Sequence, residues 1–322
     1  MIIDGRTVAN HILAGLLTRV DELEKTYDIQ PHLAVIRVGD DPAITSYITQ
    51  KEKKAKEIGA FLSVYNLSES VTEKKIQESI NFLQSKTDIH GLILQLPVPK
   101  HINYENLMLE IHPDKDVDGF RPHSPFTIPI ASAILKLLET VYVKEMQKVE
   151  QEVARLGVLQ EMPAVRSSND AISGSEERTG LQTEPNNSTF REWFISKKIV
   201  VMGKGKTGGQ PIIDLLKKQE AQVTIVDSST VGRQHITLDA DIIIAAVGKP
   251  NTLTPDMLKK DVILLGIGMS MNEEGKFVGD YNEEEIKDIA SWYTPIPGGV
   301  GPVNVACLME NLVLAAENSV KN

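Results

Sequence analysis

The chain has 322 residues, with 34 Lys and Arg against 44 Asp and Glu, so its formal net charge is −10. This acidic balance excludes proteins that bind nucleic acids or membrane surfaces nonspecifically, and a composition that is 41% hydrophobic and 24% charged excludes wholesale disorder and fibres. The one cysteine, Cys307, excludes an intrachain disulfide and a cysteine-based metal cluster, and it favours a cytoplasmic location. No signal-peptide pattern opens the chain, and its apolar runs are far short of the ~20 residues of a membrane helix. The length predicts two domains, because single cores seldom grow past about 250 residues.

The first third of the chain alternates helical and strand patterns. Apolar residues recur every four positions from Val8, which predicts an amphipathic helix to about Leu23. Further predicted elements are strands at 33–38, 61–67 and 91–95, and helices at 42–58 and 72–86. Strands separated by helices of this length indicate a parallel sheet with helices on both faces.

The second half repeats the alternation after an interruption. A helix is predicted at 131–156, and between Arg166 and Thr189 only three residues are apolar, which indicates a mobile insertion. The later predicted elements are strands at 199–202, 222–226, 241–247 and 262–265, a helix at 209–219, and a last helix that begins after Pro302 and runs to about Asn318.

A glycine-rich turn opens this second half. Gly203, Gly205 and Gly208 follow a predicted strand and precede a predicted helix, the context in which such glycines let the backbone approach a pyrophosphate. Asp227 closes the next strand, nineteen residues after Gly208. A carboxylate there accepts both ribose hydroxyls of NAD and repels the extra phosphate of NADP. The turn therefore predicts a dinucleotide site that favours NAD.

No metal site is predicted. The acidic run that begins at Asp114 resembles a calcium loop, but Pro125 occupies the position that requires glutamate. The histidines lack metal-ligand spacing, and Cys307 lies in an apolar helix with no evident base.

For three further features, the residues alone do not decide between a functional and a structural role. Tyr47 and Lys51 are four apart on a predicted helix, so they share a face, where a partly desolvated lysine could transfer protons. Other lysines follow, however, and a solvated helix face explains the pattern equally. Gln95 ends a buried strand, as a ligand-binding residue or a turn cap would. The loop 294–302, rich in proline and glycine, suits either a wall of the site or an interdomain turn.

Seven motifs follow one another along the chain: Asp4-Gly5, Val38 to Pro42, Tyr47 with Lys51, Gln95 to Pro97, Lys115 to Gly119, the loop after Met202, and Pro297 to Pro302. Together they resemble the bifunctional methylenetetrahydrofolate dehydrogenase and methenyltetrahydrofolate cyclohydrolase (FolD-type) family, over nearly the whole chain apart from the insertion.

The resemblance implies an α/β fold in which an N-terminal three-layer α/β folate domain is joined to a Rossmann-type dinucleotide-binding domain, with the active site in the cleft between them. Residues 1–140 would form the folate domain, completed by the C-terminal helix 303–322. Residues 141–196 would be an insertion, largely mobile between 160 and 190, and residues 197–302 would bind NAD(P).

The resemblance also implies the roles of individual residues. In the family's pattern the Tyr47 position stacks on the aromatic part of the substrate, the Lys51 position is the principal catalytic residue, Gln95 helps to set its protonation and Asp118 holds the pterin ring. The predicted catalytic residues are Lys51, Gln95 and Asp118. The predicted substrate-binding residues are Tyr47, Lys51, Gln95, Leu96, Asp118, Pro297, Gly298 and Gly299. The predicted cofactor-binding residues are Gly203, Lys204, Gly205, Gly208, Asp227, Ser228 and Met269.

The implied activity is oxidation of methylenetetrahydrofolate with NAD(P), followed by hydrolysis to formyltetrahydrofolate, in a homodimer and without a metal. Oxidation gives a cation delocalised over N–C–N and needs positioning more than a strong base, whereas ring opening needs proton movement, for which neutral Lys51 is the natural base. The alternatives are a dehydrogenase without cyclohydrolase activity and a nonenzymatic folate- or nucleotide-binding module that docks a partner through the insertion.

The chain departs from the family's pattern at the cofactor loop. Gly203-Lys204-Gly205 stands where Gly-Arg-Ser is usual, and Asp227-Ser228 stands where the strand often ends in His-Ser. Both changes favour NAD over NADP, although Lys204 and Lys206 can partly replace the lost ligands of a ribose phosphate. Residues Ile128 to Ala131 replace the family's Pro-Cys-Thr-Pro, and Asn304 stands where threonine is common.

Overall fold

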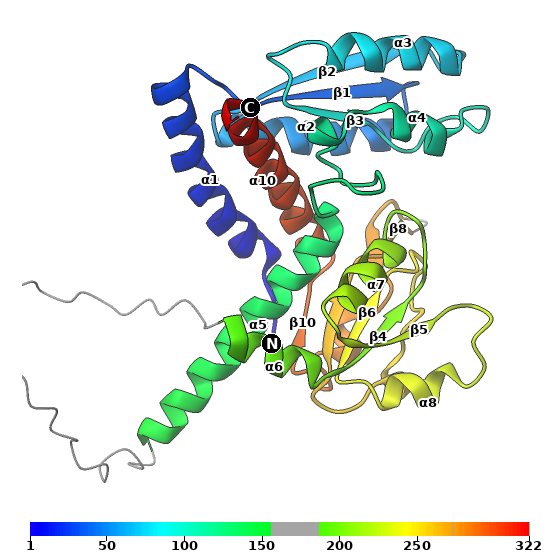
Figure 1. The fold of residues 1–322 in the computed structure, drawn as a ribbon. Coiled ribbons are helices and arrows are strands. Elements are labelled where there is room, and N and C mark those ends of the chain that lie inside the picture. The colour runs from blue at the N-terminus through cyan, green and yellow to red at the C-terminus, as the bar shows by residue number, and fades with distance from the viewer. Residues whose placement is uncertain (156–186, 273, 322) are drawn as a thin grey trace, which may run out of the picture.

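The N-terminal sheet has three parallel strands in the order β2-β1-β3 (Figure 1). The computed structural model describes residues 1–155, 187–272 and 274–321. The strands are β1 (His32–Val38), β2 (Phe61–Leu67) and β3 (Gly91–Leu94). The central strand β1 is almost entirely buried, because helices cover both faces of the sheet.

Alternate residues of β1 point to different helical layers, as the two-residue period of a strand requires. Leu33 and Val35 share a core cluster with residues of α2 (Pro42–Glu57), whereas Ala34 and Ile36 pack with α3 (Glu73–Gln84) and α4 (Tyr104–Glu110). The predicted three-layer arrangement of this domain is confirmed.

The second sheet has five parallel strands in the order β10-β7-β6-β4-β5. Its strands are β4 (Lys198–Met202), β5 (Gln222–Val226), β6 (Ile242–Ala245), β7 (Ile263–Gly266) and β10 (Trp292–Tyr293). Strand β4 lies between β5 on one side and β6 on the other, so the chain changes direction across the sheet at β4. The carboxyl ends of β4 and β6 therefore form the switch point at which open α/β sheets bind ligands.

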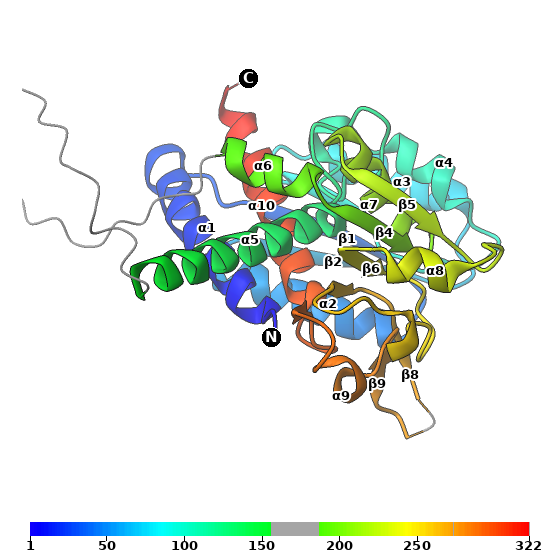
Figure 2. The same ribbon diagram turned by 90° about the horizontal axis from the view of Figure 1, so that it is seen from below.

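Helices cover both faces of this sheet as well (Figure 2). One face packs on α5 (Pro129–Arg155), α6 (Asn187–Ile195) and α7 (Gly209–Lys218), and the other on α8 (Arg233–Leu238), a 3-10 turn (Pro255–Met257) and α9 (Glu283–Ile286). A short antiparallel hairpin, β8 (Met269–Met271) with β9 (Phe277–Gly279), follows β7. The predicted Rossmann-type architecture is confirmed, and the hairpin is an element that the sequence pattern did not indicate.

Three long helices join the two sheets. In Figure 1, α1 (Gly5–Tyr27) and α10 (Val300–Lys321) lie side by side, and α5 crosses next to them, where it contacts α10 on one side and α7 of the second domain on the other. Their buried faces belong to one core cluster that also contains residues of both sheets. A two-pronged ion pair from Arg19 to Glu317, at 2.7 and 2.8 Å, links α1 to α10. The domains therefore share a continuous apolar core.

Among the described residues, α10 is the one helix long and apolar enough to cross a membrane by length and composition. Of its most apolar window, 61% is buried inside the protein, against α1, α2 and α5. Its buried residues belong to the main core cluster, so α10 is part of the core.

The N-terminus extends the second sheet beyond β10. The Ile3 N–H donates to the Tyr293 carbonyl at 2.7 Å, the Tyr293 N–H donates to Met1 O at 2.9 Å, and the terminal ammonium donates to Ser291 O at 2.6 Å. The first residues of the chain are thus anchored on the second domain before α1 begins.

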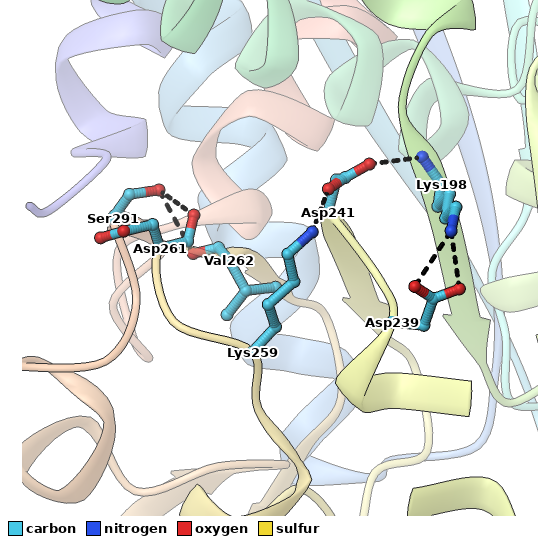
Figure 3. A network of polar contacts seen from close by, with 7 residues as sticks. All are labelled: Lys198, Asp239, Asp241, Lys259, Asp261, Val262 and Ser291. Atoms are coloured by element: carbon cyan, nitrogen blue, oxygen red, sulfur yellow. Dashed lines mark hydrogen bonds and ion pairs between the residues drawn. The ribbon is translucent and has the colours of Figure 1, made fainter. Parts of the chain in front are cut away.

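A polar network ties together the amino ends of the second sheet's strands (Figure 3). Asp241, before β6, accepts the Lys198 N–H at 2.9 Å and the Lys259 ammonium at 2.6 Å. Lys198 also pairs with Asp239 at 2.8 Å, and the Ser291 hydroxyl donates to Asp261 O at 2.7 Å. These contacts lie at the edge opposite the switch point, so they stabilise the sheet away from the candidate site.

The observed elements refine several predicted bounds. The last helix begins at Val300, three residues before the predicted start at residue 303, because Pro302 needs no hydrogen-bonded N–H in a first turn. Helix α5 continues through residue 140 without a break, and Val141 and Tyr142 are buried, so residues 141–155 form one helix with 129–140.

Residues 156–186 lie outside the described residues, as does most of the predicted mobile segment 160–190. The domain boundaries stay predictions.

Candidate active site

Lys51 and Gln95 meet at the carboxyl edge of the first sheet. Lys51 lies on α2, and its ammonium Nζ donates to Gln95 Oε1 at 2.8 Å. Gln95 comes directly after β3, is 8% exposed, and donates from Nε2 to the Leu96 carbonyl at 2.7 Å. Because that second bond occupies the amide nitrogen, the amide oxygen faces the lysine.

The environment of Lys51 disfavours its charged form. Burial lowers the pKa of Lys51, and the nearby Asp118 carboxylate partly opposes this shift. Burial raises the pKa of Asp118, with Lys51 acting in the opposite direction. The two groups are therefore an interacting, half-buried pair in which a neutral amine is more accessible than on an exposed lysine.

A cavity of about 230 Å³ lies in front of this pair. From the first domain, Lys51, Gln95, Asp118 and Tyr104 line it, together with Leu94, Leu96, Phe120, Ile128, Pro129 and Ile130. From the second domain and the last helix come Thr207, Ile267 and Asn304. The cavity is thus a cleft between the domains, with titratable groups on one wall and the end of the glycine-rich turn on the other.

A tightly closed loop positions Asp118. The buried carboxylate of Asp116 accepts the Arg121 N–H at 2.9 Å, and burial raises the pKa of Asp116 to about 6. A Cβ added at Gly119, where φ is +69°, would lie 2.7 Å from a backbone oxygen, so the turn requires glycine. Asn311 of α10 holds the loop by donating to Val117 O at 2.8 Å. The acidic run is therefore a structural turn that presents one carboxylate to the cavity.

The other predicted substrate-binding residues differ in whether they line the cavity. Leu96 lines the cavity, whereas Tyr47 is 49% exposed and lies outside the lining. Pro297, Gly298 and Gly299 also lie outside it: a Cβ on Gly5 would lie 1.7 Å from Gly299 O, so this loop packs closely against the start of α1. The phenol that lines the cavity is Tyr104, and burial raises its pKa.

Two glycines of the second-domain turn are required by packing. A Cβ on Gly203, where φ is +91°, would lie 2.5 Å from Ala246 O, and a Cβ on Gly209 would lie 1.9 Å from Gly203 O. Gly205 differs, because a Cβ there would meet no atom within 4 Å. Gly208 precedes α7 and caps it without a side-chain hydrogen bond. A turn with open space over Gly205 at a helix N-terminus fits the pyrophosphate of a dinucleotide.

The predicted ribose-binding carboxylate already has a cationic partner. Asp227 follows β5, and its Oδ2 lies 2.7 Å from Lys204 Nζ. Its Oδ1 accepts the Ser229 N–H at 2.9 Å and hydroxyl at 2.6 Å. Lys204, followed by Ser229, holds the pKa of Asp227 well below its usual range. The carboxylate is thus ionised and fixed at the strand end, beside the glycine turn.

The remaining predicted cofactor residues, Ser228 and Met269, follow the carboxyl ends of β5 and β7. Ser228 is exposed next to Asp227, and Met269 begins β8, with its carbonyl 4.0 Å from the position of a Cβ on Gly248. Among the residues that the structure describes, no group of three His, Cys, Asp or Glu side chains could hold a metal ion.

Sequence reasoning assigned no role to several residues in or near the site, among them Tyr104, Asn304 and Asp280. Tyr104 and Asn304 line the cavity, and Asp280 is fully buried beneath the loop that follows β6. Neither Tyr104 nor Asp280 stood in a motif with a recognised spacing. Asn304 was noted only as a departure, although its place in the first turn of the last helix, after a glycine-rich loop, indicated a position near the cleft.

Comparisons with known proteins agree with this architecture. The family model described as the tetrahydrofolate dehydrogenase/cyclohydrolase catalytic domain matches residues 3–118, and that of the NAD(P)-binding domain matches residues 191–320. The chain is 35% identical to the bifunctional protein FolD of Nautilia profundicola over 99% of this chain and 98% of that protein. It is 34% identical to the bifunctional protein FolD of Lactococcus lactis subsp. cremoris, over 98% of this chain and 96% of that protein.

A solved structure extends the likeness to three dimensions. The bifunctional FolD methylenetetrahydrofolate dehydrogenase/cyclohydrolase of Campylobacter jejuni matches with a TM-score of 0.81 and 30% identity. The match covers 99% of each chain.

Proposed function

Because the chain belongs to the tetrahydrofolate dehydrogenase/cyclohydrolase family, we propose that the cavity at Lys51 binds the one-carbon folate and that the turn at Gly203 binds the dinucleotide. The chain is a bifunctional enzyme of one-carbon folate metabolism, a dehydrogenase and a cyclohydrolase that uses NAD(P). The roles of the individual site residues are part of this proposal.

In the dehydrogenase reaction, a dinucleotide held at the turn of Gly203 and Gly205 would supply the hydride acceptor for the methylene carbon between two folate nitrogens. The residues of this chain contribute positioning. Asp118 and Gln95 hold the folate at the first-domain wall, and Thr207 and Ile267 approach from the second domain. The cation that forms is stabilised by delocalisation over N–C–N, so alignment of the two reactants governs this step.

In the cyclohydrolase reaction, water adds to the cationic carbon and one C–N bond breaks. The added water must lose a proton, and the departing nitrogen must gain one. Neutral Lys51 accepts the first proton and, as an ammonium, donates it to the nitrogen. The hydroxyl of the adduct then loses its proton to solvent as the formyl C=O forms, so the cation and water give the neutral formyl product and one proton. Gln95 keeps the amine directed into the cavity through its 2.8 Å hydrogen bond.

The observation that carries this assignment is the contact between Lys51 and Gln95 beside Asp118 in a cavity lined by both domains. Separate assays of methylenetetrahydrofolate oxidation and methenyltetrahydrofolate hydrolysis test it. Both rates should depend on residues of this cavity. A protein that oxidises but does not hydrolyse would favour the monofunctional alternative.

The Gln95→Glu variant should move the pH dependence of hydrolysis upward. A carboxylate in place of the amide favours the ammonium and raises the pKa of Lys51, so the rise in rate that follows deprotonation occurs at higher pH. Hydrolysis measured across pH, for this variant and for Gln219→Glu at an exposed position, checks the expectation. A profile that shifts downward, or equally in both variants, would contradict it.

We infer a preference for NAD over NADP from Asp227. Its carboxylate at the end of β5 suits ribose hydroxyls, and the Lys204 ammonium at 2.7 Å neutralises part of its charge. The pair supports NAD binding, while Lys204 moderates the repulsion of a ribose phosphate. We therefore expect a measurable but small preference for NAD over NADP.

Replacing Asp227 and replacing Lys204 should shift the preference between NAD and NADP in opposite directions. The Asp227→Ser variant frees Lys204 to pair with a phosphate and should raise kcat/KM with NADP relative to NAD by about tenfold. The Lys204→Met variant exposes the carboxylate and should strengthen the preference for NAD. Steady-state kinetics with each dinucleotide give both ratios. An unchanged ratio in both variants would exclude a role for this pair in selectivity.

The family resemblance also supports a homodimer in the cytoplasm. Cys307 is buried in α10, and burial raises the pKa of its thiol to about 12, so it suits a reduced core thiol. Sedimentation at micromolar concentration tests the dimer, for which one species of twice the chain mass is expected.

A further inference from the structure

One fully buried carboxylate lies outside the lysine cavity. Asp280 follows β9, and its side chain is 0% exposed. Its Oδ2 accepts the Val247 N–H at 3.0 Å, and its Oδ1 accepts the N–H of Gly248 at 2.7 Å and of Lys249 at 3.0 Å. A buried carboxylate with three consecutive backbone donors fixes the conformation of that backbone.

The loop that Asp280 holds comes directly after β6, at the switch point of the second sheet. Gly248 has a φ of +72°, so the loop adopts a backbone conformation that favours glycine. The loop also supports the glycine turn, because Gly203 packs so closely on the Ala246 carbonyl that a Cβ would lie 2.5 Å away. The loop and the turn thus form adjoining walls of the crevice where open sheets bind dinucleotides.

Asp280 is itself held from both sides. The neighbouring Tyr281 hydroxyl donates to Thr294 O at 2.6 Å, and Glu283 Oε1 accepts the Ile296 N–H at 2.8 Å. On the other side, a Cβ on Gly268 would lie 2.1 Å from Asp280 Oδ2, so glycine is needed there to admit the carboxylate. The carboxylate cannot swing away without disturbing these contacts.

We propose that Asp280 is the positioning residue of the dinucleotide site: through three backbone hydrogen bonds it holds loop 247–249 against the glycine turn in the geometry that receives NAD(P). This inference rests on the proposed function of that turn. Asp280 lies beneath the loop and acts through it. Its loss should impair dinucleotide binding and leave the lysine cavity in the first domain intact.

The Asp280→Asn variant tests the proposal, with Asp241→Asn as the matched control. Asp241 also accepts a backbone N–H, at 2.9 Å, but at the opposite end of the same sheet (Figure 3). The Kd for NAD+, measured by calorimetry, should rise about tenfold in Asp280→Asn and remain near that of the wild type in Asp241→Asn. Hydrolysis of methenyltetrahydrofolate without dinucleotide should be unchanged in Asp280→Asn.

A second measurement needs no variant. In the wild-type protein without dinucleotide, the amide hydrogens of residues 247–249 should exchange slowly, because each is bonded to a buried carboxylate. Rapid exchange there would overturn the proposal, as would an unchanged Kd in Asp280→Asn or an equal loss in both variants. If the wild type itself binds neither NAD+ nor NADP+, the proposed function of the turn fails instead.

Discussion

The Lys51→Met variant should lose cyclohydrolase activity by about 100-fold or more, the range that positioned proton transfer contributes. Methionine has a side chain of similar length without an amine, so it removes the proton carrier and keeps most of the packing. Oxidation of methylenetetrahydrofolate should fall much less, because that step depends on alignment of the reactants. Hydrolysis and oxidation rates measured separately on the same preparation check this difference.

Lys53→Met is the matched control for that variant. Lys53 lies on the same helix, two residues away, and is exposed. Both variants should unfold at temperatures close to that of the wild type, and Lys53→Met should hydrolyse the methenyl substrate at the wild-type rate. Undiminished hydrolysis in Lys51→Met would remove the proposed base, and an equal loss in both variants would point to a general effect of charge on the helix.

The Asp118→Asn variant should lower kcat/KM for both reactions by roughly 10- to 100-fold, the loss expected for a hydrogen bond to a buried charged group. Both reactions suffer because the folate is held in the same cavity. The variant should also move the pH profile of the remaining hydrolysis downward. Asp118 is the charge that raises the pKa of Lys51 against the effect of burial, so its removal lowers that pKa further.

The same acidic run supplies the control. Asp114→Asn changes an exposed carboxylate four residues earlier, whose side chain is 66% exposed. Its kinetics and pH profile should match those of the wild type. If Asp118→Asn shifts the profile upward, or impairs only one of the two reactions, the shared folate-binding role is wrong.

Much of the fold was predictable because its elements follow simple periodic rules. Strand β1 carries a continuous apolar run since helices cover both of its faces, and α1 repeats its apolar residues along one face. The β8–β9 hairpin escaped prediction because it has only three residues in each strand and is partly exposed. Periodicity needs longer or more buried segments to be visible.

The candidate site was predictable where a motif carried the chemistry. Lys51 and Gln95 are 44 positions apart, and only the fold, which places α2 beside the carboxyl end of β3, brings them to 2.8 Å. Tyr104 was not predictable, because its place in the cavity depends on how α4 packs under the sheet. Asp280 was missed for a similar reason, since its partners are backbone amides more than 30 positions away.

The glycines show why a motif alone leaves its role open. Gly203 and Gly205 belong to one pattern, yet packing explains Gly203 and leaves Gly205 facing open space. In the loop before α10, Gly299 is required by packing, because a Cβ there would lie 2.5 Å from the Thr294 Cβ. Sequence spacing cannot distinguish a glycine that admits a ligand from one that admits another segment of the chain.

The central claim is that Lys51 carries an unusually accessible neutral amine in the interdomain cavity. Carbon-13 NMR of labelled lysine side chains, followed across pH, measures the pKa of Lys51 directly, and exposed Lys53 serves as the internal reference. The account predicts that Lys51 titrates well below Lys53, at the pH where the hydrolysis rate rises. A Lys51 that titrates together with Lys53 would contradict it.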